Sequence, residues 1–225
     1  MSYSAVGQVF DPVSFRKHVD GLDLSWASSV TIHHTYYPDL SMRPKGWTIQ
    51  HMRNLASYYG QELGWSAGPH LFTDEDQIFG LSPLTARGVH AVSFNAASIA
   101  IEMLGDFDKE DPQSGRGNQV IETTAAAVAV LLSKLGLPAN DSTVKFHRDD
   151  PRTSKTCPGK RVSKDWFVGC VQRYLERLRR VESQADRFEV VTPESPKLPA
   201  TDVATPSPDI VKARKLITEG LALLG

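Results

Sequence analysis

Two residues that commonly bind metal ions lie ten positions apart near the end of the chain's main body. They are His147 and Cys157, in the segment KFHRDDPRTSKTCPGK (145–160). Imidazole and thiolate are both good zinc ligands, and the loop between them is long enough to bring both around one ion. Together with His33 they make three ligands and leave a fourth position open, which is the arrangement of a catalytic zinc rather than a structural one. A plain buried thiol and a surface histidine remain alternatives for this pair.

His33 belongs to the segment SVTIHHTYY (29–37), whose β-branched and aromatic residues predict a strand. Alternation places His33 with Thr31 on one face, and the apolar Val30 and Ile32 on the other. The apolar face is typical of a core, and the other face is typical of a site. A strand histidine is more often a hydrogen-bonded core residue than a ligand, so its interpretation as a ligand depends on the 145–160 cluster.

Two charged residues could work beside such an ion. Glu102 lies in the strand-like segment SIAIEML, on the same face as Ala100 and Leu104. A buried carboxylate is costly unless it is paired or used, although an ion pair or an edge position would also explain it. Lys155, two residues before Cys157, would place a cation close to the metal and to a developing oxyanion. A loop lysine on its own is usually a solvated charge.

The elements that must position these residues are strands and helices in irregular alternation. This pattern predicts an α/β domain with a central mixed sheet flanked by helices. Besides the two strands above, we expect helices over 48–63, 120–136 and 164–180, a hairpin over 70–81 and a short strand over 143–147.

The chain divides into a body and a tail. We expect a catalytic domain over 1–182, a Pro-rich linker over 183–209 and an amphipathic helix over 210–225. The apolar stripe of the terminal helix favours packing back onto the body, with an oligomer contact or a membrane contact as the alternatives.

Composition excludes several classes of protein. The formal net charge of −1 provides no strong field toward nucleic acid or anionic lipid. Two cysteines do not suggest a disulfide framework, and no run of about 18 apolar residues could span a membrane. Because the N-terminus lacks a Sec signal pattern, we expect the protein to be made in the bacterial cytoplasm. We also expect it to be a monomer.

Three segments in fixed order resemble a known family: TIHHT, NAASIAIEMLG and the FH…SKTCPG cluster. Over about residues 25–180 the chain resembles the zinc N-acetylmuramoyl-L-alanine amidases. These include amidase-type phage lysozymes, bacterial recycling amidases and peptidoglycan recognition proteins. The resemblance implies a peptidoglycan-recognition-protein-like amidase fold. It also implies hydrolysis of the amide bond between N-acetylmuramic acid and L-alanine in peptidoglycan or muropeptides.

The resemblance also implies a role for each matching residue. It makes the first histidine of the TIHHT pair a zinc ligand, with two more ligands from the FH…SKTCPG cluster. The implied set is His33, His147 and Cys157 as ligands of one zinc ion, Lys155 as the catalytic lysine, Glu102 as the general base, and His90 and Asn95 as residues lining the substrate cleft.

The chain departs from the family pattern at two places. Pro69 of GPHL stands where many phage members have the tyrosine of a GYHF segment. Without that candidate acid or oxyanion donor, Glu102 becomes the main candidate for proton transfer. His70 beside Pro69 is expected to contact substrate or to support the site. The segment from Ser41 to Gly64 does not align with the family, so part of the groove stays unassigned.

Several functions share these motifs. A non-catalytic recognition module would typically lack the cysteine, which this chain has at Cys157. A regulator with a structural zinc would not explain Glu102. Among enzymes, the alternative is a cytoplasmic amidase that recycles anhydro-muropeptides. The linker and terminal helix favour instead a phage or prophage endolysin, released to the wall in the periplasm by a holin.

Arg148 or Arg152 could bind a carboxylate of the stem peptide.

Overall fold

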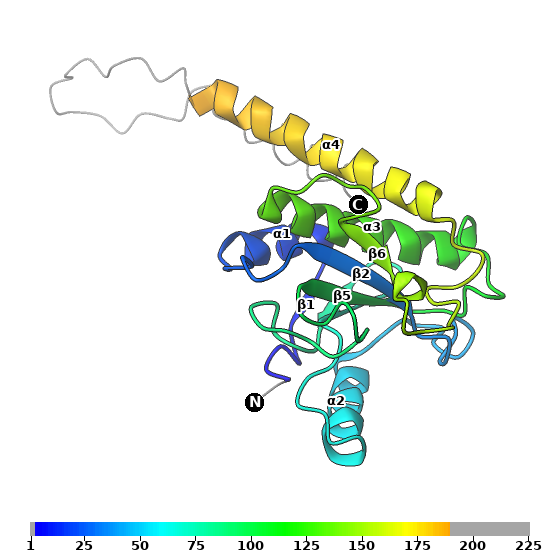
Figure 1. Cartoon of the computed structure of the whole chain (residues 1–225). Coiled ribbons are helices and arrows are strands. Elements are labelled where there is room, and N and C mark those ends of the chain that lie inside the picture. Colours follow the sequence, from blue (N-terminus) through cyan, green and yellow to red (C-terminus); the bar gives the residue numbers. More distant parts are fainter. Residues whose placement is uncertain (1–2, 190–225) are drawn as a thin grey trace, which may run out of the picture. The chain divides into compact units, whose positions relative to one another are not determined.

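A six-stranded mixed sheet organises the chain in the computed structural model, which describes residues 3–189 (Figure 1). The sheet order is β1-β4-β3-β5-β2-β6. The neighbours β3, β5, β2 and β6 run parallel, whereas β4 is antiparallel to both β1 and β3. The predicted mixed sheet is therefore confirmed. The strands are β1 (Val9–Phe10), β2 (Ser29–His34), β3 (Leu71–Thr73), β4 (Ile78–Gly80), β5 (Ser98–Met103) and β6 (Val144–Phe146).

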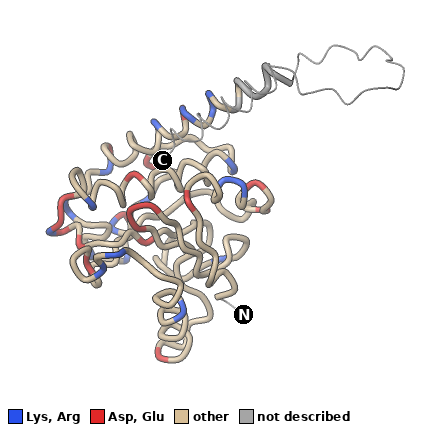
Figure 2. The backbone as a smooth tube through the Cα atoms, turned by 180° about the vertical axis from the view of Figure 1, so that it is seen from behind, with Lys and Arg blue, Asp and Glu red and all other residues tan. Residues whose placement is uncertain are grey.

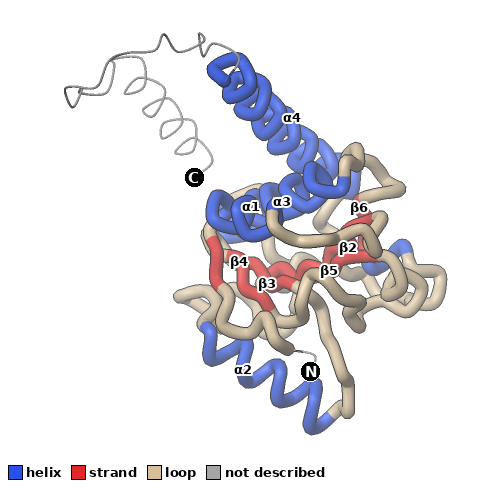
Figure 3. The backbone as a smooth tube through the Cα atoms, turned by 90° about the vertical axis from the view of Figure 1, so that its left-hand side faces the viewer, coloured by secondary structure: helices blue, strands red, loops and turns tan. Residues whose placement is uncertain are grey.

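Helices cover both faces of this sheet. Figure 3 shows α1 and α3 on one side of the strands and α2 on the other. The long helix α3 contacts β2, β3, β4 and β5, and α1 packs beside it. The helices are α1 (Pro12–Asp20), α2 (Ile49–Ser57), which continues into the π-helical turn η1 (Tyr58–Glu62), α3 (Gly115–Leu135), the 3₁₀ turn η2 (His147–Asp149) and α4 (Lys164–Glu189).

Alternation along the strands separates a core face from a site face. On β3, the Thr73 hydroxyl is 2.7 Å from that of Thr124, which places Thr73 on the α3 side. The preceding residue, Phe72, points the opposite way and contacts the ring of Trp47. Phe72 is in register with Glu102 on β5, and Glu102 is in register with His33 on β2. These three side chains therefore lie side by side on the face away from α3.

Most element boundaries match the sequence prediction. Gly136 ends α3 with a left-handed φ of 65°, as expected for a C-terminal glycine. The strand expected over 29–37 stops at His34, because Tyr36 adopts a left-handed φ of 59° that breaks the ladder. The helix expected over 48–63 ends earlier as an α-helix and finishes as the π-helical turn η1.

The chain forms two units, Met1–Leu175 and Glu176–Gly225. In the second unit, α4 continues to Glu189 and so occupies the first seven residues of the predicted linker 183–209. The rest of that linker and the predicted helix over 210–225 lie outside the described residues. Among the residues that the structure describes, no helix is long and apolar enough to cross a membrane.

Charges of both signs lie side by side along the helices and loops of the body, as Figure 2 shows. This arrangement agrees with the net charge of −1. An anionic ligand would therefore have to be recognised by local groups rather than by a field of the whole molecule.

Cys170 on the first turns of α4 belongs to the core. Its side chain is fully buried, as are those of Phe167 and Val171. We expect Cys170→Ala to lower the free energy of unfolding by about 1 kcal/mol, because it leaves a void the size of one heavy atom. Urea denaturation measures this loss. Metal binding by His33, His147 and Cys157 should not change, and its loss would contradict a purely structural role for Cys170.

Candidate active site

The residues predicted to do chemistry meet at the carboxyl ends of three parallel strands. His33 is the penultimate residue of β2, and Glu102 is the penultimate residue of β5. His147 follows β6 directly in the turn η2. Carboxyl ends of parallel strands share one edge of a sheet, which is where α/β proteins usually bind ligands. Cys157 reaches the same edge from the loop that follows η2.

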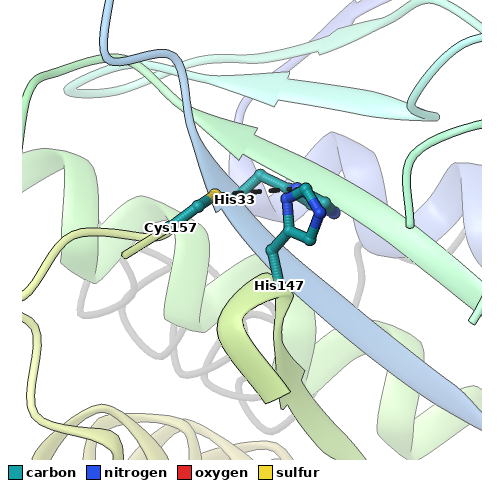
Figure 4. A group of neighbouring side chains, drawn as sticks. All are labelled: His33, His147 and Cys157. Atoms are coloured by element: carbon teal, nitrogen blue, oxygen red, sulfur yellow. Dashed lines mark hydrogen bonds between the residues drawn. The ribbon is translucent and has the colours of Figure 1, made fainter. Parts of the chain in front are cut away.

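Three side chains form a group that could hold a metal ion: His33, His147 and Cys157 (Figure 4). Their ligand atoms all lie within 4.8 Å of one another, and this is the one such group in the described part of the chain. Nδ1 of His33 is 3.1 Å from Nδ1 of His147 and 3.7 Å from Sγ of Cys157.

These separations fit a tetrahedral zinc ion. With Zn–N bonds of about 2.0–2.1 Å and a Zn–S bond of about 2.3 Å, two nitrogens lie about 3.3–3.4 Å apart, and nitrogen and sulfur about 3.6 Å apart. Two imidazoles and one thiolate are also a donor set that zinc prefers. The residues present therefore fit the ion that the family resemblance implies.

Burial holds the three ligands in their uncharged forms. It lowers the pKa of His33 well below the ordinary value, and the neighbouring His90 and His147 lower it further. The pKa of His147 is also lowered by burial. Burial raises the pKa of the Cys157 thiol, although the His34 main-chain N–H donates to Sγ at 3.4 Å. Neutral imidazoles are ready to bind a metal, and a bound cation is what would favour the thiolate.

Glu102 lies beside this group and is largely shielded from water. Its Oε1 is 3.8 Å from Nδ1 of His33, and 15% of its side chain is exposed. Burial raises the pKa of Glu102 to about 8, and the charge of Lys155 opposes that rise. Lys155 is exposed and lines the same cavity. The predicted base and the predicted lysine therefore both face the group that could hold a metal.

A cavity of about 810 Å³ opens above these residues. Several aromatic side chains line its walls, and the sequence patterns did not identify them as part of the site. The aromatic residues of the wall are Tyr36, Tyr37, Trp47, Tyr59, Trp65 and Phe72. One signal was present, because the helix predicted over 48–63 has Leu55 and Tyr59 one turn apart, and both line the cavity.

His90 and Asn95 lie in one turn, and both line the cavity. The Asn95 side-chain oxygen accepts hydrogen bonds from the main-chain N–H groups of His90 and Ala91, each at 2.9 Å. The His90 ring reaches His33, with Nδ1 at 3.1 Å from Nε2 of that residue. Burial lowers the pKa of His90 to about 3, which keeps its imidazole neutral.

His70 does not reach the cavity, and its predicted contact with substrate needs correction. The side chain is fully buried against Trp26. Nδ1 accepts a hydrogen bond from the Ala100 N–H at 3.0 Å, and Nε2 donates to the Ala86 carbonyl at 2.9 Å. Both ring nitrogens are thus satisfied by main-chain groups, and His70 supports the fold beneath the site.

Of the two arginines predicted as carboxylate ligands, one supports a loop and the other lines the cavity. Arg148 donates to the carbonyls of Gly159 and Val162, at 2.8 and 2.7 Å, and so braces the loop that carries Cys157. Arg152 lines the cavity and stays a candidate for binding a carboxylate.

Residues 25–160 match a family model described as N-acetylmuramoyl-L-alanine amidase. The match covers more than half of the chain and includes both histidines and the cysteine of the metal-binding group.

The chain belongs to the N-acetylmuramoyl-L-alanine amidase family.

Solved structures of such amidases and of related proteins resemble this chain at low sequence identity. One is the endolysin N-acetylmuramoyl-L-alanine amidase LysCS from Clostridium intestinale, at 23% identity over 64% of this chain and 82% of that one, with a TM-score of 0.49. Another is Drosophila PGRP-LB, at 22% identity over 63% and 85%, also with a TM-score of 0.49. No protein of curated function matches the chain.

Proposed function

We propose that this protein is a zinc-dependent amidase that hydrolyses the bond between N-acetylmuramic acid and the first L-alanine of the stem peptide. The observation that carries the proposal is the meeting of His33, His147 and Cys157 with Glu102 in one cavity. A recognition module that binds without cutting needs neither a thiol ligand nor a shielded carboxylate beside it. Family membership supplies the class of bond.

Each residue has a task that its position supports. His33, His147 and Cys157 would hold the zinc ion, which would supply Lewis acidity by polarising a carbonyl and lowering the pKa of a bound water to about 7. Glu102 in its carboxylate form accepts the proton of the attacking water and passes it to the leaving alanine nitrogen. The charge of Lys155 lowers the pKa of Glu102, and a cation held by the three ligands would lower it further. Lys155 offers a positive charge to the tetrahedral oxyanion, a contribution typically worth about 10²–10³ in rate for one donor. Both side chains face the cavity in which the amide must lie.

The cavity suits a substrate with a sugar and a peptide. Its volume of about 810 Å³ is large enough for a ligand of several rings or residues. Tyr36 and Tyr37 are 55% and 72% exposed at its rim, where flat aromatic faces can pack against a sugar ring. Arg152 is available for a peptide carboxylate.

The proposal is tested by metal analysis and by product analysis. Purified protein should contain about one zinc ion per chain, and a chelator should abolish the release of L-alanine-terminated stem peptides from purified sacculi. Mass spectrometry of the products identifies the bond that is cut. Activity that is indifferent to chelators, or cleavage at another bond, would overturn the proposal.

The biological setting that we propose is that of a phage or prophage endolysin, released to the cell wall by a holin. The expected linker and terminal helix support this setting over a recycling amidase. The two settings differ in substrate, because an endolysin cuts intact wall and a recycling amidase cuts soluble anhydro-muropeptides. Comparing kcat/KM on sacculi with that on purified anhydro-muropeptides distinguishes them, and a strong preference for the soluble fragment would favour recycling.

A further inference from the structure

His90 occupies a position that the proposed chemistry does not use. It was expected to contact substrate, yet its ring lies edge-on to the ring of His33, with the centroids 5.2 Å apart. It comes from the turn before β5 and is separated from His33 by 57 residues of sequence. Each of its ring nitrogens has a partner, and the two partners together determine where the protons lie.

The first partner is a main-chain carbonyl. Nε2 of His90 is 3.2 Å from the carbonyl oxygen of Ser98. A carbonyl can only accept a hydrogen bond, so the proton of a neutral His90 ring must be on Nε2. Nδ1 of the same ring is then without a proton and can only accept.

The second partner is the His33 ring, and the position of its proton follows from that of His90. Nδ1 of His90 faces Nε2 of His33 at 3.1 Å. Because the His90 nitrogen accepts, Nε2 of His33 must donate and therefore carries the proton of that ring. Nδ1 of His33 is left with a free electron pair. This is the atom that lies 3.1 Å from His147 Nδ1 and 3.7 Å from Cys157 Sγ, at the centre of the proposed metal site.

We infer that the Ser98 carbonyl and His90 form a relay that fixes the tautomer and orientation of His33, so that its Nδ1 electron pair points at the metal. The inference rests on the proposed function, because it requires that a metal binds there. His90 is a positioning residue that acts through His33. Partners of this kind typically contribute about 10–100-fold to metal affinity.

The turn that carries His90 is itself held in place. Asn95 binds the main-chain N–H of His90, and the Ser93 side chain donates to Asp150 Oδ1 at 2.6 Å. Asp150 is buried and lies three residues after His147. The relay is therefore tied to the segment that provides the second histidine ligand.

The test compares zinc affinities measured by competition with a chromophoric chelator. His90→Leu removes the acceptor, and we expect zinc affinity to fall about 10–100-fold. His90→Asn places an amide oxygen two bonds from Cβ, as Nδ1 is, and we expect it to recover much of the affinity. The matched control is His70→Leu, which removes another buried histidine near His90 that does not contact His33. We expect His70→Leu to lower the Tm and to leave the zinc affinity of the folded protein within about threefold.

A second readout does not depend on any variant folding. Long-range ¹H–¹⁵N spectra of the metal-free protein report which nitrogen of His33 carries the proton, and we expect Nε2. A proton on Nδ1 would overturn the inference, as would a His90→Leu variant that binds zinc as tightly as the unmodified protein. Equal losses in His90→Leu and His70→Leu would also overturn it, because they would indicate general loosening. Failure of the proposed function is distinct, since the unmodified protein would then bind no zinc at all.

Discussion

We expect Cys157→Ser to abolish tight zinc binding and hydrolysis and to leave the fold intact. The substitution replaces a soft anionic ligand with a neutral hydroxyl at a position where the other two ligands are neutral imidazoles. Because a direct ligand is lost, the fall in zinc affinity should exceed the about 10–100-fold cost of losing an outer-shell partner. Amidase activity at limiting zinc should fall in parallel. Competition with a chelator and release of stem peptide from sacculi measure the two effects.

The chain offers a matched control in its other buried cysteine. Cys170→Ser places the same hydroxyl in the core, so we expect it to lower the free energy of unfolding without changing zinc affinity. Undiminished zinc binding and cleavage by Cys157→Ser would show that the thiol is not a ligand. If both serine variants lost zinc, the loss would reflect destabilisation rather than ligation.

Glu102→Gln separates proton transfer from metal binding. The amide keeps the shape of the side chain but cannot accept the water proton, so kcat should fall by about 10²–10⁴ with little change in KM. Zinc content should stay near that of the unmodified protein, since Oε1 lies beside the ligands at 3.8 Å from His33 and is not required as a donor. Steady-state kinetics on a soluble muropeptide and elemental analysis measure both quantities.

Glu122→Gln is the control for this change. Glu122 lies on α3 and pairs with Arg173 near the surface, so its loss should cost about 1 kcal/mol of stability or less and leave kcat unchanged. Loss of zinc from Glu102→Gln would instead make this carboxylate a ligand or a support for one. Full activity with full zinc would mean that another group takes the proton, and His90 would then need testing in that role as well.

Local patterns in the sequence determined the faces of the strands and the main elements. The two-residue period placed His33 opposite the apolar Val30 and Ile32, and it placed Glu102 on one face with Ala100 and Leu104. The structure has His33 and Glu102 side by side on the face away from α3. Gly136 marked the end of α3 because a glycine readily adopts the left-handed turn found there. These features depend on neighbours within a few positions, so a single sequence carries them. The three family segments then predicted which residues would share a site.

Tertiary structure alone decided which side chains touch. His33 and His147 are separated by 114 residues, and their meeting depends on β2 pairing in register with β6 and β5. The same register brings Glu102 beside His33. No local period signals this, because strand order and register are determined by long-range packing. His70 and His90 are both histidines near glycine or proline in the sequence. Only the folded loops place one between main-chain groups beneath the site and the other against the ligand His33.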